Sequence, residues 1–386
     1  MLMRPTWFFA VLVALMVIAS GQAIAVAPSG SLNGADNTTT IRFVFDKDYG
    51  PFTYEDNGSV QGFELDLLNL IGKVEGFSVI AQPMIWADAQ LFFQKGDADV
   101  IGGFIKTEER QKRYNFTESP HGSWDIMTFV RDDSGIKSAA MLRGKKVAAQ
   151  KGSVSYSIVK NLTGVQLLAY DYEQECLLAL QQGDVDAFVC GSSSTWFRIR
   201  QQNISGIRAL ATPWEMHSLY FGVRDRELKK SLDRGMEIIT QDGRYDRLYR
   251  RWFVRELSES EISALVNASR ESSLNAYAPY SGLAVGAAVL TDSGRIYTGC
   301  NIENALYGYS TSALKVAIFK AISEGDGNIR AAANFLPDAR AIAPAADERQ
   351  ILFEFNRGTL VILGENGNYE IKMVSEIFPY AFEMRS

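Results

Sequence analysis

The chain has 386 residues, 47% of them hydrophobic and 22% charged, with a formal net charge of −6. These values are ordinary for globular protein, and the length predicts two or three domains. The acidic balance argues against a nucleic-acid-binding protein, the three cysteines form no CxxC pair, and the two histidines, His121 and His217, lie too far apart in sequence to favour a histidine-based metal site.

The N-terminus has the pattern of a secretory signal. Arg4 precedes an apolar run over residues 7–19, and the small-x-small sequence Ala23-Ile24-Ala25 follows it. This pattern predicts a cleaved signal peptide over residues 1–25 and an extracytoplasmic location, either periplasmic or at the cell surface. An uncleaved membrane anchor is the alternative, because the run is nearly long enough to span a bilayer. Residues 26–40 are rich in Ser, Gly, Asn and Thr and predict a flexible lead-in.

Strands and helices are predicted to alternate after the lead-in. Apolar residues at helical spacing predict a helix over residues 62–71. Strands are predicted before and after it, over residues 41–45 and 77–81, and a further helix should end at residues 90–95. This alternation predicts an α/β fold with a parallel sheet and right-handed crossovers.

The most informative stretch surrounds Arg110. A turn at Gly96-Asp97 leads into a predicted buried strand over residues 98–101, a glycine-rich loop with Gly103, and a helix start at Thr107. Arg110 then lies just beyond the C-terminal end of a strand, where open α/β sheets bind ligands. Its planar guanidinium suits a carboxylate. A surface arginine on a charged helix is the alternative reading.

Several segments resemble family 3 extracellular solute-binding proteins. The string GGFIKTEERQKRYNFTESP is similar to the family's TxER…FSxPY segment, and the segments over residues 46–76, 142–162, 183–189 and 242–253 resemble other parts of the family. The resemblance implies a two-lobed, type II periplasmic-binding-protein-like domain over residues 41–254. The first lobe would comprise about residues 41–127 and 218–254, and the second about residues 128–217.

The resemblance also implies which residues bind the ligand. In the family the residue matching Arg110 clamps the carboxylate of an amino acid or small acid, and a helix that opens at Gly152-Ser153 would face the same anion with free N–H groups. Family positions in or near the cleft match Asp46, Tyr49 and Phe52, although the two aromatic residues could instead pack loops. The full set of expected ligand-binding residues is Asp46, Tyr49, Phe52, Gly103, Arg110, Gly152 and Ser153.

One departure from the family concerns the ligand's ammonium group. Amino-acid binders usually carry an Asp just after the "DA" strand of the second lobe, and Gly191 occupies that place here. A buried ammonium without a counter-charge is costly, so another carboxylate or polar metabolite is at least as good a candidate as a plain α-amino acid. The family implies delivery of the solute to a membrane transporter or a sensor.

The C-terminal part resembles cytidine deaminase over residues 259–386. The string GCNIENALYG is specific to that family, in which the residues matching Asn301 and Glu303 hold the ribose. The resemblance implies a smaller α/β/α domain and, because cytidine deaminases are dimers or tetramers, a homo-oligomer.

The zinc and proton-transfer positions of that family are changed. Where the family has three thiolate ligands, this chain has Ser312, Ala345 and Glu348, and Leu314 replaces the proton-shuttling Glu. These changes predict that the chain is not an enzyme, has no metal or other cofactor, and uses the domain for assembly or nucleoside binding. The alternatives are an exported cytidine deaminase regulated by the solute-binding domain, and a scaffold in which both parts only bind.

Overall fold

The fold is described from a computed structural model that covers residues 39–210, 212–336, 340–365, 367–378 and 381–382. The predicted signal peptide and almost all of the predicted lead-in lie outside these residues. In the part of the chain described, no helix is both long enough and apolar enough to cross a membrane.

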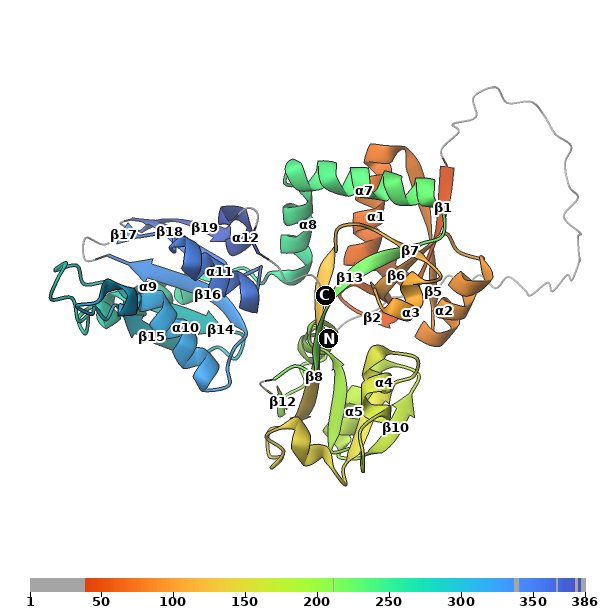
Figure 1. The fold of residues 1–386 in the computed structure, drawn as a ribbon, viewed down its shortest axis with the longest axis horizontal. Helices are drawn as coiled ribbons and strands as arrows, with labels where there is room; N and C mark the ends of the chain where they lie inside the picture. The colour runs from red at the N-terminus through yellow and green to blue at the C-terminus, as the bar shows by residue number, and fades with distance from the viewer. Residues whose placement is uncertain (1–38, 211, 337–339, 366, 379–380, 383–386) are drawn as a thin grey trace, which may run out of the picture. The chain divides into compact units, whose positions relative to one another are not determined.

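The first part of the chain is built on a ten-stranded sheet (Figure 1). Its strands are β1 (Thr39–Asp46), β5 (Phe77–Met84), β6 (Val100–Ile105), β7 (Asn115–Phe116), β8 (Gly122–Arg131), β9 (Lys146–Gln150), β10 (Gln166–Tyr170), β11 (Ala187–Gly191), β12 (Ile207–Ala209) and β13 (Glu215–Val223). A small separate sheet contains β2 (Asp48–Tyr49), β3 (Thr53–Asp56) and β4 (Ser59–Gln61).

Helices connect most of these strands. They are α1 (Phe63–Glu75), α2 (Trp86–Lys95), α3 (Glu108–Gln111), the 3₁₀ turn η1 (Ala139–Leu142), α4 (Val154–Lys160), α5 (Glu173–Gln182), α6 (Ser192–Gln201), α7 (Arg226–Gln241) and α8 (Arg244–Phe253).

The strand order β10-β9-β11-β8-β13-β6-β1-β5 divides the sheet into two parallel halves. Strand β1 pairs parallel to β5 and β6, while β9 pairs parallel to β10 and β11. The long antiparallel strands β8 and β13 join the halves, so the chain crosses to the second lobe and later returns. We call β1 to α3 with α7 and α8 the first lobe, and β9 to α6 the second lobe. This topology confirms the predicted type II α/β fold.

The glycine-rich segment differs from its prediction. Gly102 and Gly103 lie within strand β6 rather than in a loop after it. A Cβ on Gly102 would lie 2.2 Å from Glu64 Oε2 and 2.8 Å from the Phe43 ring, so no larger residue fits there. Gly103 has φ +60, which glycine adopts without steric cost. The strand can therefore continue past both residues to Ile105.

The C-terminal part forms a second, six-stranded sheet in the order β15-β14-β16-β17-β18-β19. Its elements are α9 (Glu259–Ser273), β14 (Gly286–Thr291), β15 (Ile296–Cys300), η2 (Tyr307–Tyr309), α10 (Ala313–Ser323), β16 (Ile329–Phe335), β17 (Arg340–Ala341), α11 (Ala346–Phe355), β18 (Leu360–Glu365), β19 (Asn368–Met373) and α12 (Val374–Ile377).

Helices cover both faces of this second sheet. Ala287 and Val289 of β14 pack into a core with α10, while the alternate residues Ala288 and Leu290 pack into a separate core with Leu265 of α9. Residues two apart in a strand face the same side, so α9 and α10 must lie on opposite faces. Figure 1 shows these helices against the sheet. The predicted α/β/α architecture is thereby confirmed.

Candidate ligand-binding site

A cavity lies between the two lobes at the ends of several strands. Asp46 ends β1 in the first lobe, and Gln150 ends β9 in the second. Both are among its lining residues, which are Asp46, Tyr49, Trp86, Gly103, Ile105, Arg110, Trp124, Gln150, Ser153, Val154 and Glu173. Its position at the strand ends is where open α/β sheets bind ligands.

Arg110 supplies the positive charge of this cavity. Thr107 caps the short helix α3 by accepting the Arg110 N–H at 3.3 Å, which fixes the start of the turn. The guanidinium donates to the Ile105 carbonyl at 3.1 Å and to Gln90 Oε1 at 3.0 Å, and it lies over the Phe104 ring at 4.1 Å. Burial lowers the pKa of Arg110 to about 10. No described carboxylate forms an ion pair with it, so the guanidinium can accept an anion from outside the chain.

Aromatic side chains form much of the wall. Tyr49 stacks on Phe52 at 5.0 Å between ring centroids and meets the edge of Trp124 at 5.8 Å. Phe52 is fully buried behind Tyr49, against Phe253, and does not line the cavity. The Tyr49 hydroxyl and Trp124 Nε1 are buried and have no hydrogen-bond partner among the described residues. Two polar atoms in the cavity wall thus remain free for a ligand.

The start of helix α4 lies at the second-lobe side of the cavity. Ser153 caps this helix: its hydroxyl accepts the Tyr156 N–H at 3.0 Å and donates to the Gln150 carbonyl at 2.8 Å. Gly152 does not line the cavity, but its carbonyl accepts from Trp86 Nε1 at 3.2 Å and from Gln90 at 3.3 Å. Gly152 therefore contacts the first lobe instead of facing the ligand space.

Gly103 lines the cavity and is held by a carboxylate behind it. Both Glu64 oxygens accept the Gly103 N–H at 2.9 Å, and Glu64 also bonds His121 Nε2 at 2.6 Å. Glu64 and His121 are almost completely buried. The Gly103 N–H is consequently used inside the protein, and Glu64 fixes the backbone at this edge of the site.

The cavity is lined by two buried acids, and only one of them was predicted from the sequence. Asp46 was expected from the sequence, whereas Glu173, the first residue of α5, was not. Burial raises the pKa of Asp46 to about 7, although a hydrogen bond from Gln150 at 2.6 Å opposes the shift. Burial likewise raises the pKa of Glu173 to about 8, against hydrogen bonds from Cys190 and Ser194. Glu173 looked like an ordinary first-turn acid of a helix, so no sequence signal marked it.

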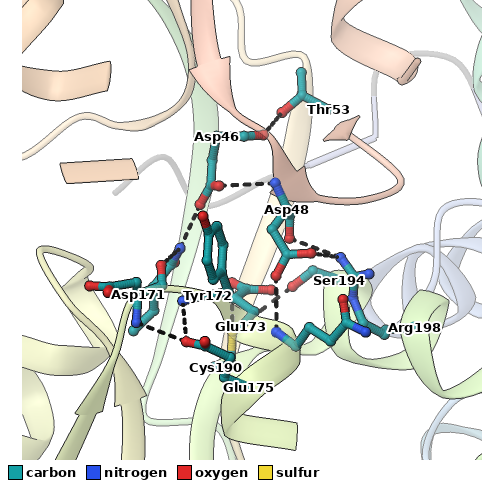
Figure 2. A network of polar contacts seen from close by, with 12 residues as sticks. Asp46, Asp48, Thr53, Asp171, Tyr172, Glu173, Glu175, Cys190, Ser194 and Arg198 are labelled. Carbon is teal, nitrogen blue, oxygen red and sulfur yellow. Dashed lines mark hydrogen bonds and ion pairs between the residues drawn. The ribbon is translucent and has the colours of Figure 1, made fainter. Parts of the chain in front are cut away.

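A polar network connects the lobes beside the cavity (Figure 2). Asp48 of the first lobe pairs with Arg198 of the second, and the Asp48 backbone carbonyl accepts from the same guanidinium at 3.1 Å. Asp48 also accepts the Gln174 N–H at 3.0 Å. The side chains of Asp48 and Arg198 are each only 11% exposed, so water screens this contact little.

The structure explains the glycine at position 191. A Cβ on Gly191 would lie 1.2 Å from Trp124 Nε1, so the indole occupies the space that a side chain would need. The carboxyl groups that reach the cavity come instead from Asp46 and Glu173.

The predicted nucleoside-binding residues Asn301 and Glu303 lie together in the C-terminal part. Asn301 accepts the Val285 N–H at 2.8 Å and donates to the Leu283 carbonyl at 2.9 Å. Glu303 accepts the N–H groups of Tyr280 and Ser281 at 2.9 and 3.2 Å. Both side chains therefore fix the backbone of the loop over residues 280–285.

The zinc ion that the deaminase resemblance implies does not fit the residues at its positions. Ser312 Oγ is buried without a described partner, Leu314 lies in the apolar core, and Ala345 offers only a methyl group. Glu348 already accepts the Ala345 N–H at 2.7 Å and an Asn334 N–H at 3.2 Å. One engaged carboxylate and a neutral hydroxyl do not supply the three N or S ligands of such a site.

Comparisons with known proteins bear on each part separately. Residues 41–255 match the family model of bacterial extracellular solute-binding proteins, family 3, and residues 238–337 match that of the cytidine and deoxycytidylate deaminase zinc-binding region. The arginine-binding extracellular protein ArtP of Bacillus subtilis is 22% identical over 250 residues, covering 63% of this chain and 98% of ArtP.

A solved structure and a second relative add to these matches. The structure of an ancestral arginine-binding protein bound to arginine is 30% identical, with a TM-score of 0.52, over 55% of this chain and 98% of that one. The cytidine deaminase of Sporosarcina psychrophila is 36% identical over 124 residues, covering 32% of this chain and 91% of the deaminase.

The deaminase matches correct one prediction from the sequence. The chain was expected not to be an enzyme, and that expectation is contradicted: a 36% identical cytidine deaminase and a deaminase family model point to enzymatic activity in the C-terminal part. That expectation rested on four changed positions, whereas the similarity to the deaminase extends over 124 residues. The chain belongs to the bacterial extracellular solute-binding proteins of family 3, and its C-terminal part belongs to the cytidine deaminase family.

Proposed function

We propose that the chain captures a small carboxylate-bearing solute, an amino acid or another organic acid, between the two lobes of its solute-binding part. The solute's carboxylate binds Arg110 and the N–H groups of Val154 and Ser155 at the start of α4, which have no carbonyl partner within the helix. The Tyr156 N–H of the same turn already donates to Ser153. The solute's apolar part packs on Tyr49, Trp86 and Trp124. Relatives named for arginine binding support an amino acid within this class.

One observation carries the proposal: Arg110 is a partly buried, largely desolvated guanidinium that lines a cavity, with no described carboxylate paired to it. An uncompensated buried charge costs free energy unless an opposite charge joins it. A surface arginine would not pay this cost, because water would solvate it. The two free polar atoms of Tyr49 and Trp124 support the same conclusion.

A ligand screen tests the proposal. The exported part of the chain is expected to show a raised melting temperature with at least one compound among L-arginine, L-lysine, L-glutamine, L-alanine, L-lactate and succinate, since a ligand that binds only the folded state stabilises it. L-Alaninamide serves as the control, because an amide replaces the carboxylate of L-alanine. No shift with any carboxylate, measured to millimolar concentration, would contradict the proposal.

We infer the biological setting from the family. Export by the N-terminal segment would bring the solute-binding part outside the cytoplasm, and closure of the lobes would present a distinct surface to a partner. We take the partner to be an ABC transporter, with a membrane sensor as the alternative. The family's extracellular name and its delivery role support this assignment.

For the C-terminal part, we propose that it joins copies of this chain. Two loops, residues 274–283 and 302–309, form one face through hydrogen bonds between Tyr277 and the backbone of Asn301 and Glu303. This loop face exposes the large side chains Leu274, Tyr277, Tyr280, Leu283, Ile302, Leu306, Tyr307 and Tyr309. Glu303, the acid of this face, accepts the Tyr280 and Ser281 N–H groups, so its carboxylate is held against its own loop. An exposed apolar face of this kind is typical of a contact between copies.

Sedimentation measurements test this assembly. The wild-type chain is expected to sediment as a dimer or larger, and the double substitution Tyr307→Asp with Tyr309→Asp is expected to yield monomers, because it places charges in an apolar interface. Phe319→Ser, at an exposed aromatic residue of α10 outside the loop face, should leave the mass unchanged. A monomeric wild-type chain would contradict the proposal.

A further inference from the structure

Helices α10 and α11 of the C-terminal part begin at the positions from which the deaminase family holds zinc. Ser312 is the N-cap residue of α10, and Ala345 is the N-cap residue of α11. A metal ion that joins two segments contributes its binding free energy to the stability of the fold. Because the residues at these positions do not fit zinc, other contacts must hold the two helix starts together.

The C-terminal part also lacks the donor atoms that zinc prefers. Over residues 259–386 the sequence contains one cysteine, Cys300, and no histidine. Cys300 ends β15, and its thiol donates to the Asn275 carbonyl at 3.3 Å. In the part of the chain that the structure describes, no group of three His, Cys, Asp or Glu side chains is placed to hold a metal ion. Even two copies together would bring fewer thiolates than the family's site contains.

An ion pair joins the first turns of the two helices instead. Lys315, in the first turn of α10, pairs with one oxygen of Asp347, in the first turn of α11. The other Asp347 oxygen accepts the Glu348 N–H at 3.0 Å. Beneath this pair, Leu314 of α10 and Leu352 of α11 are fully buried in one apolar core. The two helices are thus connected by charge near the surface and by apolar packing below it.

Glu348 connects the start of α11 to the sheet. It is 4% exposed, and its carboxylate accepts the Ala345 N–H at 2.7 Å and an Asn334 side-chain N–H at 3.2 Å. The first bond satisfies a backbone donor at the helix start, and the second reaches β16, to which Asn334 belongs. Because an unpaired buried carboxylate would cost free energy, these bonds hold α11 in place against β16.

The charge at the helix starts agrees with such a replacement. Zinc with three thiolates has a formal charge of about −1, and so do Lys315, Asp347 and Glu348 taken together. Helix α10 has no acid in its own first turn, whereas α11 has both of these acids. Negative charge is favourable here, because the N-terminal end of a helix carries partial positive charge.

We propose that the Lys315–Asp347 pair and the Glu348 carboxylate replace zinc as the connection between α10, α11 and β16, so that the C-terminal part reaches its fold without a metal ion. This connection lies within one chain, and it depends neither on solute binding nor on the assembly of copies. It accounts for an α/β/α architecture that persists although the zinc positions have changed.

Metal analysis of the full chain, combined with hydrogen–deuterium exchange, tests the proposal. After purification in buffer that contains zinc, we expect less than about 0.1 zinc atom per chain, compared with about one for an intact site. Amide exchange in peptides that cover α10 and α11 should be the same with EDTA as with added zinc. About one bound zinc per chain, or faster exchange in these helices after chelation, would overturn the proposal.

Substitutions of the connecting side chains measure their contributions. Glu348→Ala removes the acceptor of the Ala345 and Asn334 N–H groups, so exchange in α11 should become at least about tenfold faster. Lys315→Met removes only a partly exposed ion pair, and an increase of about two- to fivefold is expected. The control is Glu354→Ala, at an exposed acid of α11, which should change exchange by less than about twofold. Equal exchange in Glu348→Ala and in the control would overturn the proposal.

Restoring the thiolates gives a test in the opposite direction. The triple substitution Ser312→Cys, Ala345→Cys and Glu348→Cys places thiols at the family's ligand positions. This variant should bind about one zinc per chain, and chelation should then speed exchange in α10 and α11 at least about tenfold. Ser312→Cys alone should bind none. A folded triple variant that takes up no zinc would overturn the proposal, because the connecting contacts would then not lie at the position of a metal site.

Discussion

Replacing Arg110 by alanine is expected to weaken binding of the carboxylate ligand by about 30-fold to 4,000-fold, which corresponds to about 2–5 kcal/mol. The reason is that the substitution removes a charge-assisted fork from a buried site and leaves the ligand's carboxylate without a partner. Titration followed by tryptophan fluorescence measures the effect, because Trp86 and Trp124 line the cavity. Arg110→Lys keeps the positive charge but loses the two-pronged guanidinium, so its ligand affinity should lie between those of the wild type and Arg110→Ala.

The control for this prediction lies three residues along the same segment. Arg113 is exposed and pairs with Glu109 at 3.4 Å on the surface, so Arg113→Ala should leave the dissociation constant unchanged. A purely structural role for Arg110 would lower the stability of the ligand-free protein by as much as it weakens binding. We expect the ligand-free protein to lose less unfolding free energy than the ligand loses in binding free energy. The reason is that the substitution also removes a desolvated, unpaired charge, which itself destabilises the ligand-free state. An unchanged dissociation constant in Arg110→Ala would refute its role.

Glu64→Ala is expected to cost the solute-binding part about 3–5 kcal/mol of unfolding free energy. The substitution leaves the buried imidazole of His121 and the Gly103 N–H without their shared acceptor, and it opens a gap beside Phe43. Because Gly103 lines the cavity, ligand affinity should fall as well. Urea unfolding measures the stability change.

Tryptophan fluorescence makes this measurement specific to the solute-binding part. Five of the six tryptophans lie between residues 86 and 252, the sixth is Trp7, and none lies after Trp252. The signal therefore reports unfolding of this part and not of the deaminase-family part. The control is Glu55→Ala, at an exposed acid of β3, which should change stability by less than about 0.5 kcal/mol. Equal effects of the two substitutions would show that Glu64 is not the support we describe.

The sequence predicted those features of the site that depend on local pattern. Arg110 follows a buried strand and a Thr107 cap within ten residues, and Ser153 likewise caps the helix after β9. Such signals can be read without knowledge of the tertiary structure, because a helix cap and a strand end fix the positions of the side chains next to them. The α/β alternation similarly predicted the first sheet, whereas the second sheet was expected only from the resemblance to cytidine deaminase.

The features that the sequence did not predict depend on contacts between distant segments. Glu173 meets Asp46 only because the lobes come together across 127 residues of chain, and its own surroundings resemble any helix start. Trp124 fills the space beside Gly191, although 67 residues separate them, so a position that looked like a missing counter-charge is a packing constraint. Phe52 was expected in the ligand cleft, with loop packing as the alternative, and it lies behind Tyr49 instead. The sequence does not reveal which of two stacked aromatic rings faces the cavity.

A crystal structure of the chain with the solute that raises its melting temperature most would test the central claim most directly. We predict electron density for that solute between the lobes, with a carboxylate oxygen about 2.8 Å from the Arg110 guanidinium. A solute bound elsewhere, or an Arg110 side chain directed into solvent beside an occupied cavity, would contradict the account.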